Sequence, residues 1–476
     1  MSPIEGAAIG AAVGATAVTA ARWLRVAQRE HYLVGSVTPF LWRWLRSGRV
    51  GPAVRGRTSK LAWTRRLKTL AVVWLIVHVV VVALLALVVP LWLAVALAAV
   101  ALPLVLDAAL AVTTPLERRL ATPYVERASA RLREIRPTVV GITGSYGKTS
   151  TKVVLAHLLG ATRSTYATPA SFNNRAGLAR AVNEGLNPGT EVFVAEMGTY
   201  GKGEIAELCA WCAPEIAIIT AIGPVHLERF GTEDAIVEAK SEILEGARVA
   251  ILNVDDERLS ALAARREGAG QRVVRVSSRD QNADVAVIAA DDRRARVWIS
   301  GDDMGEVDPL TAAAGNAACA LAAAVELGAS RTEAVRRLAT APVAAHRLVA
   351  ATSDAGIVVL DDTFNSNPAG ARRALSVLRS HAAVAARRVV ITPGMIELGP
   401  RSRGENAAFA AAAGEVADVL VIVGSTNRKA LTGGAQRAGL ETVHVPTREA
   451  AVAWVRANLT NGDAVLYEND LPDHYP

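Results

Sequence analysis

The chain has 476 residues, which is enough for two or three domains with large buried cores. Hydrophobic residues make up 51% of it, more than in most soluble domains, and its net charge is +7. Of its 52 Lys and Arg and 45 Asp and Glu, residues 1–136 hold 18 and 6, which leaves 34 and 39 for residues 137–476. The basic excess therefore lies at the front, where it favours an anionic lipid surface over nucleic acid as the partner.

The first residues combine an apolar run with a basic segment. Residues 4–20 are rich in Gly and Ala and only marginally long and hydrophobic for a membrane span. A signal peptide is disfavoured because the positive charges follow this run instead of preceding it. Residues 22–68 hold 12 Lys and Arg, one acid and four Trp. We expect them to form a basic, amphipathic linker at a membrane surface.

Two long apolar runs follow. Residues 69–89 carry no charge, and as a helix they could cross roughly 30 Å of hydrocarbon. After Pro90, residues 91–112 are interrupted only by Asp107. A buried pair of core helices is the alternative, but it would show regular polar positions. We predict a transmembrane hairpin in the plasma membrane, with both basic flanks and all later domains on the cytoplasmic side of a multi-pass protein.

Two polar residues within this hairpin are functional suspects, since polar groups are costly in lipid. His78 lies mid-span and Asp107 lies near the end of a span. For each residue we expect the ordinary role, a neutral imidazole packed in the hairpin and a carboxylate at the interface.

From residue 137 onwards, strand-like apolar runs alternate with helical patterns. Such alternation predicts an α/β fold, in which helices cover a parallel sheet. A new set of runs begins near Pro342. We therefore expect an α-helical membrane region over residues 1–136, a central α/β domain over residues 137–340 and a Rossmann-like α/β domain over residues 341–476.

A glycine turn follows the apolar residues 138–140 and opens into an apolar helix. Its backbone N–H groups can close around phosphate oxygens, Lys148 can reach the terminal phosphates, and the Thr149 hydroxyl can ligate Mg²⁺. The usual pattern has a further glycine where Ile142 stands, and the alternative is a plain helix N-cap. We expect an ATP-binding loop made of Gly144, Ser145, Tyr146, Gly147, Lys148, Thr149 and Ser150.

Further motifs follow this loop in order. The whole series is GSYGKTST from Gly144, SFNNRAG from Ser171, AEMG from Ala195, IGPVHLE from Ile222, AKSEI from Ala239, HR from His346 and LDDTFNSNP from Leu360. Over about residues 137–476 it resembles the motif series of the Mur ligases. The resemblance implies an ATP-dependent acid–amino acid ligase of peptidoglycan precursor synthesis. Its expected partners are a cell-wall precursor acceptor, such as a muramoyl peptide, and D-alanyl-D-alanine or a related amino acid or dipeptide.

The resemblance also implies a reaction and a site. ATP phosphorylates a carboxylate to an acyl phosphate, and an amine then displaces phosphate, which needs charge neutralisation around the γ-phosphate. Lys148 and Thr149 are expected to hold the phosphates and one Mg²⁺, which Glu196 also binds. His226 is expected to bind a second Mg²⁺.

Lys240 stands where Mur ligases carry a carbamylated lysine, whose carbamate is an oxygen ligand for Mg²⁺. The ordinary alternative is a solvated helix lysine paired with Glu238 or Glu242. By the same resemblance, Arg347 meets the γ-phosphate and Asp362 the ribose. Asn316 matches the first Asn of the adenine-side motif, while Cys319 replaces the second.

Cys209 and Cys212 could suggest a redox or metal site, but without a second Cys pair we expect a structural role. The first 136 residues differ from the soluble UDP-sugar domain usual in the family, so the carrier of the acceptor stays open. Arg175 stands where close relatives often have an acid.

The alternatives are a membrane scaffold or transport ATPase with a ligase-like fold, a Mur-type ligase that makes another amino-acid polymer, and a membrane phosphate-loop kinase. The combined presence of Lys148, Glu196, His226, Lys240, Arg347 and Asp362 favours the cell-wall ligase.

Overall fold

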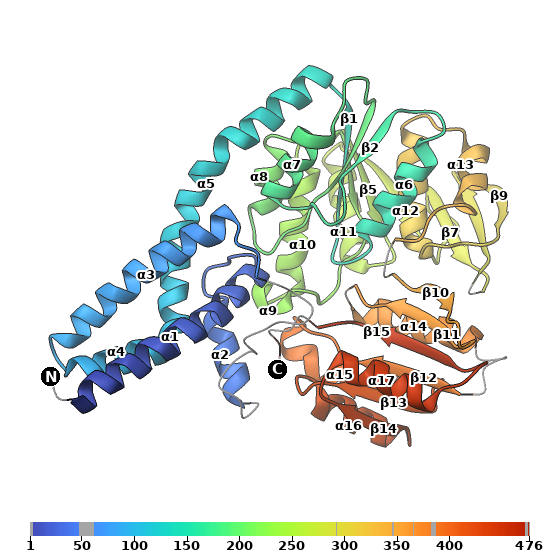
Figure 1. The fold of residues 1–476 in the computed structure, drawn as a ribbon. Coiled ribbons are helices and arrows are strands. Elements are labelled where there is room, and N and C mark those ends of the chain that lie inside the picture. Colours follow the sequence, from blue (N-terminus) through green and yellow to red (C-terminus); the bar gives the residue numbers. More distant parts are fainter. Residues whose placement is uncertain are drawn as a thin grey trace. The chain divides into compact units, whose positions relative to one another are not determined.

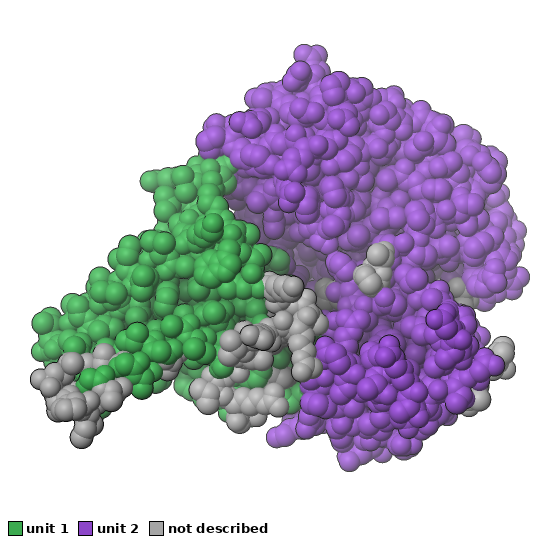
Figure 2. Space-filling model, viewed as in Figure 1, with its two compact units in different colours: residues 1–122, 424–426, 471–476 green, residues 123–423, 427–470 purple. Residues whose placement is uncertain are grey.

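The structure is a computed structural model that describes residues 3–46, 61–291, 293–344, 347–364, 366–381, 387–471 and 475. It has two compact units (Figure 2). The first comprises residues 1–122, 424–426 and 471–476, and the second comprises residues 123–423 and 427–470. Residues 47–60 of the predicted basic linker, and His346 of the predicted HR motif, lie outside the described residues.

The first unit is helical (Figure 1). Its helices are α1 (Pro3–Arg29), α2 (Val37–Arg46), α3 (Arg65–Ala86), α4 (Leu91–Val100) and most of α5 (Leu102–Ile135). The predicted linker over residues 22–68 is therefore largely helical where it is described: it contains the end of α1, all of α2 and the first turn of α3.

The predicted second span is broken. Residues 91–112 are divided between α4 and α5, which meet at a bend of 72°. Pro103 at the start of α5 explains the break, because its ring excludes a preceding helical turn and it has no N–H to donate. Within the described residues, α3 is the one helix that is long and apolar enough to cross a membrane by itself. Helices α4 and α5 would provide a second span only if the bent pair crosses the membrane as one broken span.

Helix α3 is apolar on two faces. Leu67, Leu70 and Trp74 are buried in the core of the first unit. An opposite stripe is exposed, and it consists of Val72, Leu75, Ile76, Val79, Val80 and Leu84. A monomeric soluble domain rarely exposes so continuous an apolar surface.

The two polar residues of the apolar runs have structural surroundings. Asp107 caps α2, because its carboxylate accepts hydrogen bonds from the backbone N–H groups of Val37 (3.2 Å) and Thr38 (2.9 Å) and from the Thr38 hydroxyl (2.5 Å). His78 is buried beside Trp74, with ring centroids 5.4 Å apart. The packing of His78 agrees with the ordinary role expected for it. Asp107 acts as a helix cap within the first unit, and its place at a membrane interface stays a prediction.

The second unit contains two α/β domains. The first has a nine-stranded sheet in the order β2-β3-β1-β4-β5-β6-β7-β8-β9, parallel as far as β7 and antiparallel beyond it. Its strands are β1 (Thr138–Thr143), β2 (Thr165–Ala167), β3 (Val192–Glu196), β4 (Ile216–Ile219), β5 (Val249–Asn253), β6 (Arg272–Ser277), β7 (Val285–Ala289), β8 (Ala295–Ile299) and β9 (Asp302–Val307). The central strands are almost wholly apolar because both faces are covered.

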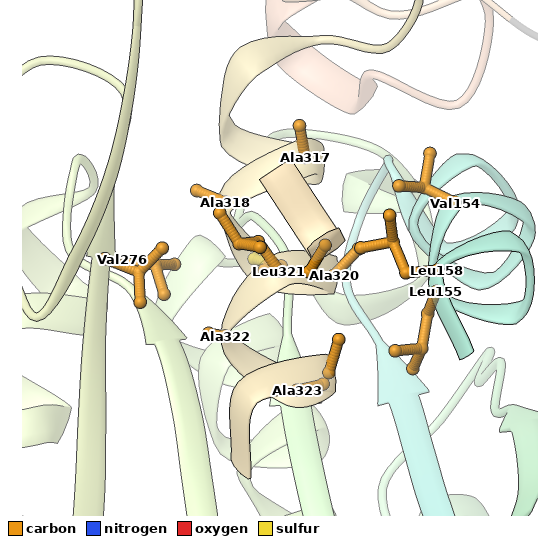
Figure 3. Close-up of a cluster of buried hydrophobic side chains, with 14 of the residues drawn as sticks. Val154, Leu155, Leu158, Val276, Ala317, Ala318, Ala320, Leu321, Ala322 and Ala323 are labelled. Carbon is orange, nitrogen blue, oxygen red and sulfur yellow. The ribbon is translucent and has the colours of Figure 1, made fainter. Parts of the chain in front are cut away.

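The helices of this domain are α6 (Lys148–Leu159), α7 (Arg175–Gly185), α8 (Glu204–Cys209), α9 (Leu227–Phe230), α10 (Glu233–Ser241), α11 (Glu257–Gly268), α12 (Ala314–Glu326) and α13 (Arg331–Leu338), with a 3₁₀ turn at Glu242–Leu244. Helix α6 packs on the alanine-rich α12, where Leu158 lies beside Ala320 (Figure 3). The end of α5 also joins this domain, since Val125, Ala128 and Leu132 belong to its core.

The other domain has a six-stranded sheet in the order β10-β11-β15-β12-β13-β14, with β10 antiparallel to the rest. Its elements are β10 (Val349–Thr352), β11 (Val358–Asp362), α14 (Pro368–His381), β12 (Arg388–Thr392), α15 (Ser402–Ala413), β13 (Val419–Val423), α16 (Arg428–Arg437), β14 (Glu441–Val445), α17 (Arg448–Asn458) and β15 (Ala464–Glu468), with a 3₁₀ turn at Gly399–Arg401. The predicted α/β fold with two parallel-sheet domains is confirmed.

Candidate active site

The glycine turn links β1 to α6 and needs its glycines. Gly144 and Gly147 have φ angles of 150° and 89°, which side chains rarely allow. A Cβ atom at Gly144 would lie 2.0 Å from Thr220 Oγ1, and one at Gly147 would lie 2.3 Å from Asn316 Oδ1. The loop therefore fits only without side chains at these two positions.

Four polar residues converge at the start of α6. Thr149 Oγ1 donates to Glu196 Oε2 over 3.0 Å, and the Lys152 ammonium lies 2.9 Å from the same oxygen. Asn173 Nδ2 donates to Glu196 Oε1 over 3.1 Å. Burial alone would raise the pKa of Glu196, but the charges of Lys152 and Lys148 outweigh it and lower the pKa. Glu196 is therefore an ionised carboxylate at the end of β3.

This cluster fits a divalent cation. A hydroxyl and an ionised carboxylate are the oxygen ligands that Mg²⁺ takes in nucleotide sites, and Thr149 and Glu196 present both. Lys148 donates to the Gly144 carbonyl over 2.7 Å, and burial lowers the pKa of its ammonium. Phosphate oxygens could replace that carbonyl as the acceptor.

His226 and Lys240 belong to the same domain. His226 follows the IGPV turn at a φ of 63°, and its Nδ1 contacts the Glu397 carboxylate. Burial lowers the pKa of His226, although Glu397 acts in the opposite direction. The neutral imidazole that results could offer Nε2 to a cation.

Lys240 lies in α10 and is only 2% exposed. Burial, together with the charge of Lys148, places its pKa well below the usual value. The alternative of a solvated lysine paired with its neighbours is wrong. Glu238 instead pairs with Lys202, and Glu242 accepts hydrogen bonds from the N–H groups of Gly203 (2.7 Å) and Ala206 (3.0 Å). A neutral buried amine is the form that reacts with CO₂.

A cavity of about 380 Å³ brings several predicted nucleotide-binding residues together. It is lined by Tyr146, Gly147, Ser150 and Asn316 from the first α/β domain and by Arg347 and Asp362 from the second. Gly144, Ser145, Lys148 and Thr149 are not among its lining residues in the described part of the chain. Ser145 instead donates its hydroxyl to the Gly223 carbonyl over 3.2 Å, which makes it a support of the loop.

Arg347 and Asp362 influence each other electrostatically. Burial raises the pKa of Asp362 to about 6, against the opposing charge of Arg347 and a hydrogen bond from the Leu348 N–H. The Arg347 guanidinium lies over the Phe364 ring, 4.5 Å from its centroid. Arg347 also lines a second cavity of about 550 Å³, together with Thr149, Lys152 and Ser171.

Three further residues of the site, Lys152, Asn173 and Glu397, had no role predicted from the sequence. Lys152 could have been found, because it stands one helical turn after Lys148 and faces the same side. Asn173 is part of the SFNNRAG motif that begins at Ser171. Glu397 had no local signal, since it meets His226 across 171 positions of sequence.

The cysteines form neither a disulfide nor a candidate metal site in the described part of the chain. Cys209 and Cys212 are free, and among the described residues neither belongs to a group of three or more His, Cys, Asp and Glu that could hold a metal ion. Burial raises the pKa of Cys209 to about 12, so its thiol stays protonated. Cys319 lies fully buried in the α12 core and is not among the described residues that line the 380 Å³ cavity.

Comparison with known proteins identifies the family. The family described as Mur ligase middle domain matches residues 142–326, and the one described as Mur ligase, glutamate ligase domain, matches residues 346–467. The UDP-N-acetylmuramoyl-tripeptide–D-alanyl-D-alanine ligase of Mycobacterium leprae is 33% identical over 371 residues, which are 69% of this chain and 70% of that protein.

Solved structures agree with this match. A MurF crystal structure from Acinetobacter baumannii has a TM-score of 0.63 and 26% identity, over 73% of this chain and 77% of that one. The MurF ligase of Thermotoga maritima in complex with ADP has the same fold, with a TM-score of 0.63 and 23% identity over 74% and 80% of the two chains. The chain belongs to the Mur ligase family of ATP-dependent acid–amino acid ligases.

Proposed function

We propose that this enzyme adds D-alanyl-D-alanine, or a closely related amino acid or dipeptide, to a muramoyl peptide in peptidoglycan precursor synthesis. The observation that carries the proposal is the cluster of Lys148, Thr149 and Glu196 beside a cavity that Arg347 and Asp362 complete. The identity with the Mycobacterium leprae ligase supports this choice of substrate.

In the first step, a carboxylate oxygen of the acceptor peptide attacks the γ-phosphorus of ATP, and ADP leaves. Lys148 and Arg347 neutralise the charge that the phosphate oxygens carry as this bond forms. Asn316 and Asp362 are proposed to hold the nucleoside, because both line the cavity beside the glycine loop. Thr149 and Glu196 would hold one Mg²⁺, and His226 and a carbamylated Lys240 would hold a second. Bound there, the cations would supply further charge neutralisation.

In the second step, the free amine of the incoming dipeptide attacks the acyl carbon. The C–N bond forms, phosphate leaves with the shared oxygen, and the amine loses a proton. The second cavity, which shares Arg347 with the first and is lined largely by apolar atoms, offers room for a peptide beside Thr149. Because Arg347 and Phe364 come from the second α/β domain, both domains are needed to enclose the reactants.

We further propose that the first unit anchors the enzyme in the plasma membrane. The exposed stripe of α3 supports this, because lipid chains would cover a surface that water otherwise meets. Helix α2 adds two exposed apolar side chains, Trp42 and Leu45, together with the basic residues Arg43 and Arg46. Such a helix suits an anionic lipid surface.

A membrane anchor makes a lipid-linked acceptor a second candidate beside the UDP-linked one. The observation that favours it is that residues 1–122 of the first unit, which neither family match covers, present this lipid-seeking surface. The two candidates share the muramoyl peptide and differ only in the carrier.

The test uses full-length protein in nanodiscs with ATP, Mg²⁺ and D-alanyl-D-alanine. ADP release is measured with UDP-linked and lipid-linked acceptor, and each product is identified by mass spectrometry. We expect release only when both an amine and a carboxylate substrate are present, and an acceptor heavier by one dipeptide less one water. ADP release that ignores both substrates would favour the membrane ATPase. Equal kcat/KM for the UDP-linked acceptor with and without residues 1–122, and none for the lipid-linked one, would leave the first unit as an anchor alone.

A further inference from the structure

One contact within the second unit joins the two α/β domains beside the proposed second cation site. The His226 imidazole, from the first α/β domain, contacts Oε2 of Glu397, which follows β12 in the second. The other oxygen of Glu397 lies 3.7 Å from Arg229. Arg229 also stacks over Tyr200 at 4.5 Å, and the Tyr200 ring meets His226 edge-on at 4.9 Å. Both oxygens of the carboxylate therefore face partners from the opposite domain.

The loop that carries Glu397 is held by three buried asparagines. Asn406 accepts from the Met395 N–H over 2.8 Å and donates to the Met395 carbonyl over 3.0 Å. Asn427 donates to the Pro393 carbonyl over 3.0 Å, and Asn469 donates to the Gly394 carbonyl over 2.7 Å. These side-chain amides satisfy backbone groups of residues 393–395 that have no partner in a helix or strand. They present Glu397 from a fixed backbone, at a φ of 63° that non-glycine residues seldom adopt.

The loop also approaches the His226 segment closely. A Cβ atom added to Gly399 would lie 3.3 Å from the Glu228 nitrogen, so a side chain there would push the loop away. Arg401, at the end of the same turn, pairs with Glu233 of α10. The contact is thus built by backbone fit as well as by charge.

We infer that Glu397 is a positioning residue for the second Mg²⁺ site, acting through His226, and this rests on the proposed function. An imidazole that donates Nδ1–H to a carboxylate is fixed in the tautomer that leaves the Nε2 lone pair free for a metal, and its ring is held in one orientation. Because Glu397 belongs to the other α/β domain, the second cation site reaches full affinity only when the two domains meet. Cation binding and domain closure then favour each other.

An ordinary ion pair between domains would also explain a contact of His226 with Glu397. The neighbouring pair Arg401–Glu233 crosses the same interface and touches neither His226 nor Lys240 in the described contacts, so it provides a matched control. If Glu397 affected cation binding only by holding the two domains together, loss of the His226–Glu397 contact and loss of the Arg401–Glu233 pair would weaken cation binding equally.

The experiment titrates Mn²⁺ into full-length protein in detergent with a non-hydrolysable ATP analogue, and free Mn²⁺ is followed by electron paramagnetic resonance. We expect two bound Mn²⁺ per wild-type chain. Glu397→Gln should weaken the second Mn²⁺ by about 10- to 100-fold, the usual effect of losing such a partner, while the first is unchanged. Arg401→Gln should leave both affinities within about twofold of wild type, and thermal melts of the apo proteins control for folding.

A double-variant cycle tests the route of action. If Glu397 acts through His226, then Glu397→Gln should add no further loss of the second Mn²⁺ in a His226→Ala background. An equal loss in both backgrounds, or an equal loss in Arg401→Gln and Glu397→Gln, would overturn the inference and leave the proposed ligase reaction standing. Binding of only one Mn²⁺ by the wild-type protein would instead overturn the second cation site itself, and the inference with it.

Discussion

The Lys152 ammonium and the Thr149 hydroxyl meet the same oxygen of Glu196, at 2.9 and 3.0 Å. The side chains of Lys152 and Glu196 are only 4% and 2% exposed. Lys152 therefore compensates a buried charge that would otherwise be costly to keep ionised. It also fixes the carboxylate next to the hydroxyl with which it is proposed to hold Mg²⁺.

Lys152→Met should consequently destabilise the protein, because a buried carboxylate would be left without its cation. Breaking such a pair costs roughly 3–5 kcal/mol, which should appear as a clearly lower melting temperature. Adding Glu196→Gln to Lys152→Met should recover part of the loss. A single variant that melts like wild type would show that water compensates Glu196 instead.

Lys148→Ala should abolish ADP formation with little effect on the melt. The ammonium is proposed to neutralise phosphate charge in the transition state, and loss of one such contact costs at least ~10²-fold in turnover. Lys202→Ala is the control, since this lysine is half exposed and pairs with Glu238 on the surface. Comparable turnover in the two variants would remove Lys148 from the nucleotide site.

Lys240 should carry a carbamate in the active enzyme. Burial lowers the pKa of Lys240 well below its usual value, which favours the neutral amine that reacts with CO₂. Protein equilibrated with ¹³C-bicarbonate should show a carbamate carbon resonance that Lys240→Ala lacks. The same variant should be nearly inactive, and small carboxylic acids should partly restore turnover by occupying the missing ligand position. A wild-type spectrum without this resonance would contradict the expectation.

Glu468 predicts a pH-dependent stability. Its carboxyl is fully buried at the end of β15, where the hydroxyls of Ser366 and Thr392 donate to it. Burial raises its pKa to about 7, although both hydroxyls act in the opposite direction. The native state therefore binds the proton more tightly than the unfolded chain, so this group's contribution is complete below pH 4.5 and is lost as the pH rises through 7.

Glu468→Gln lacks this titration. The free energy of unfolding of the variant relative to wild type should therefore rise between pH 5 and pH 8, by up to roughly 3 kcal/mol at 1.36 kcal/mol per pKa unit. Its melting temperature relative to wild type should rise over the same range. Melts of both proteins at four pH values give the comparison. A constant offset across this range would show that Glu468 titrates alike in the folded and unfolded states.

The end of α5 decides where the ligase domains can be separated from the first unit. Val125 and Ala128 are buried in the core of the central domain, and the Tyr124 carbonyl accepts a hydrogen bond from Asn183 over 2.9 Å. A chain that starts at Pro123 should thus be soluble and melt higher than one that starts at Arg131. Equal melting temperatures would show that the end of α5 adds no stability.

Much of this fold could be predicted because its signals are local. The central strands are continuous apolar runs in the sequence because both of their faces are covered. The glycine loop can be recognised from its residue types. The break at Pro103 had a local signal too, but the hydropathy of residues 91–112 concealed it. The contact between His226 and Glu397 and the burial of Lys240 depend on tertiary packing, which the spacing of residues in the sequence does not reveal.

The alanine-rich face of α12 has a consequence for the nucleotide loop. Small side chains such as Ala317 and Ala320 let α6 lie close to α12, and this closeness brings Asn316 of one helix against Gly147 at the start of the other. The distance between the glycine loop and Asn316 therefore depends on the small size of alanine side chains farther along α12. A larger side chain at Ala320 should therefore push α12 away from α6 and move Asn316 relative to Gly147, so that a residue outside the proposed nucleotide site would change its width.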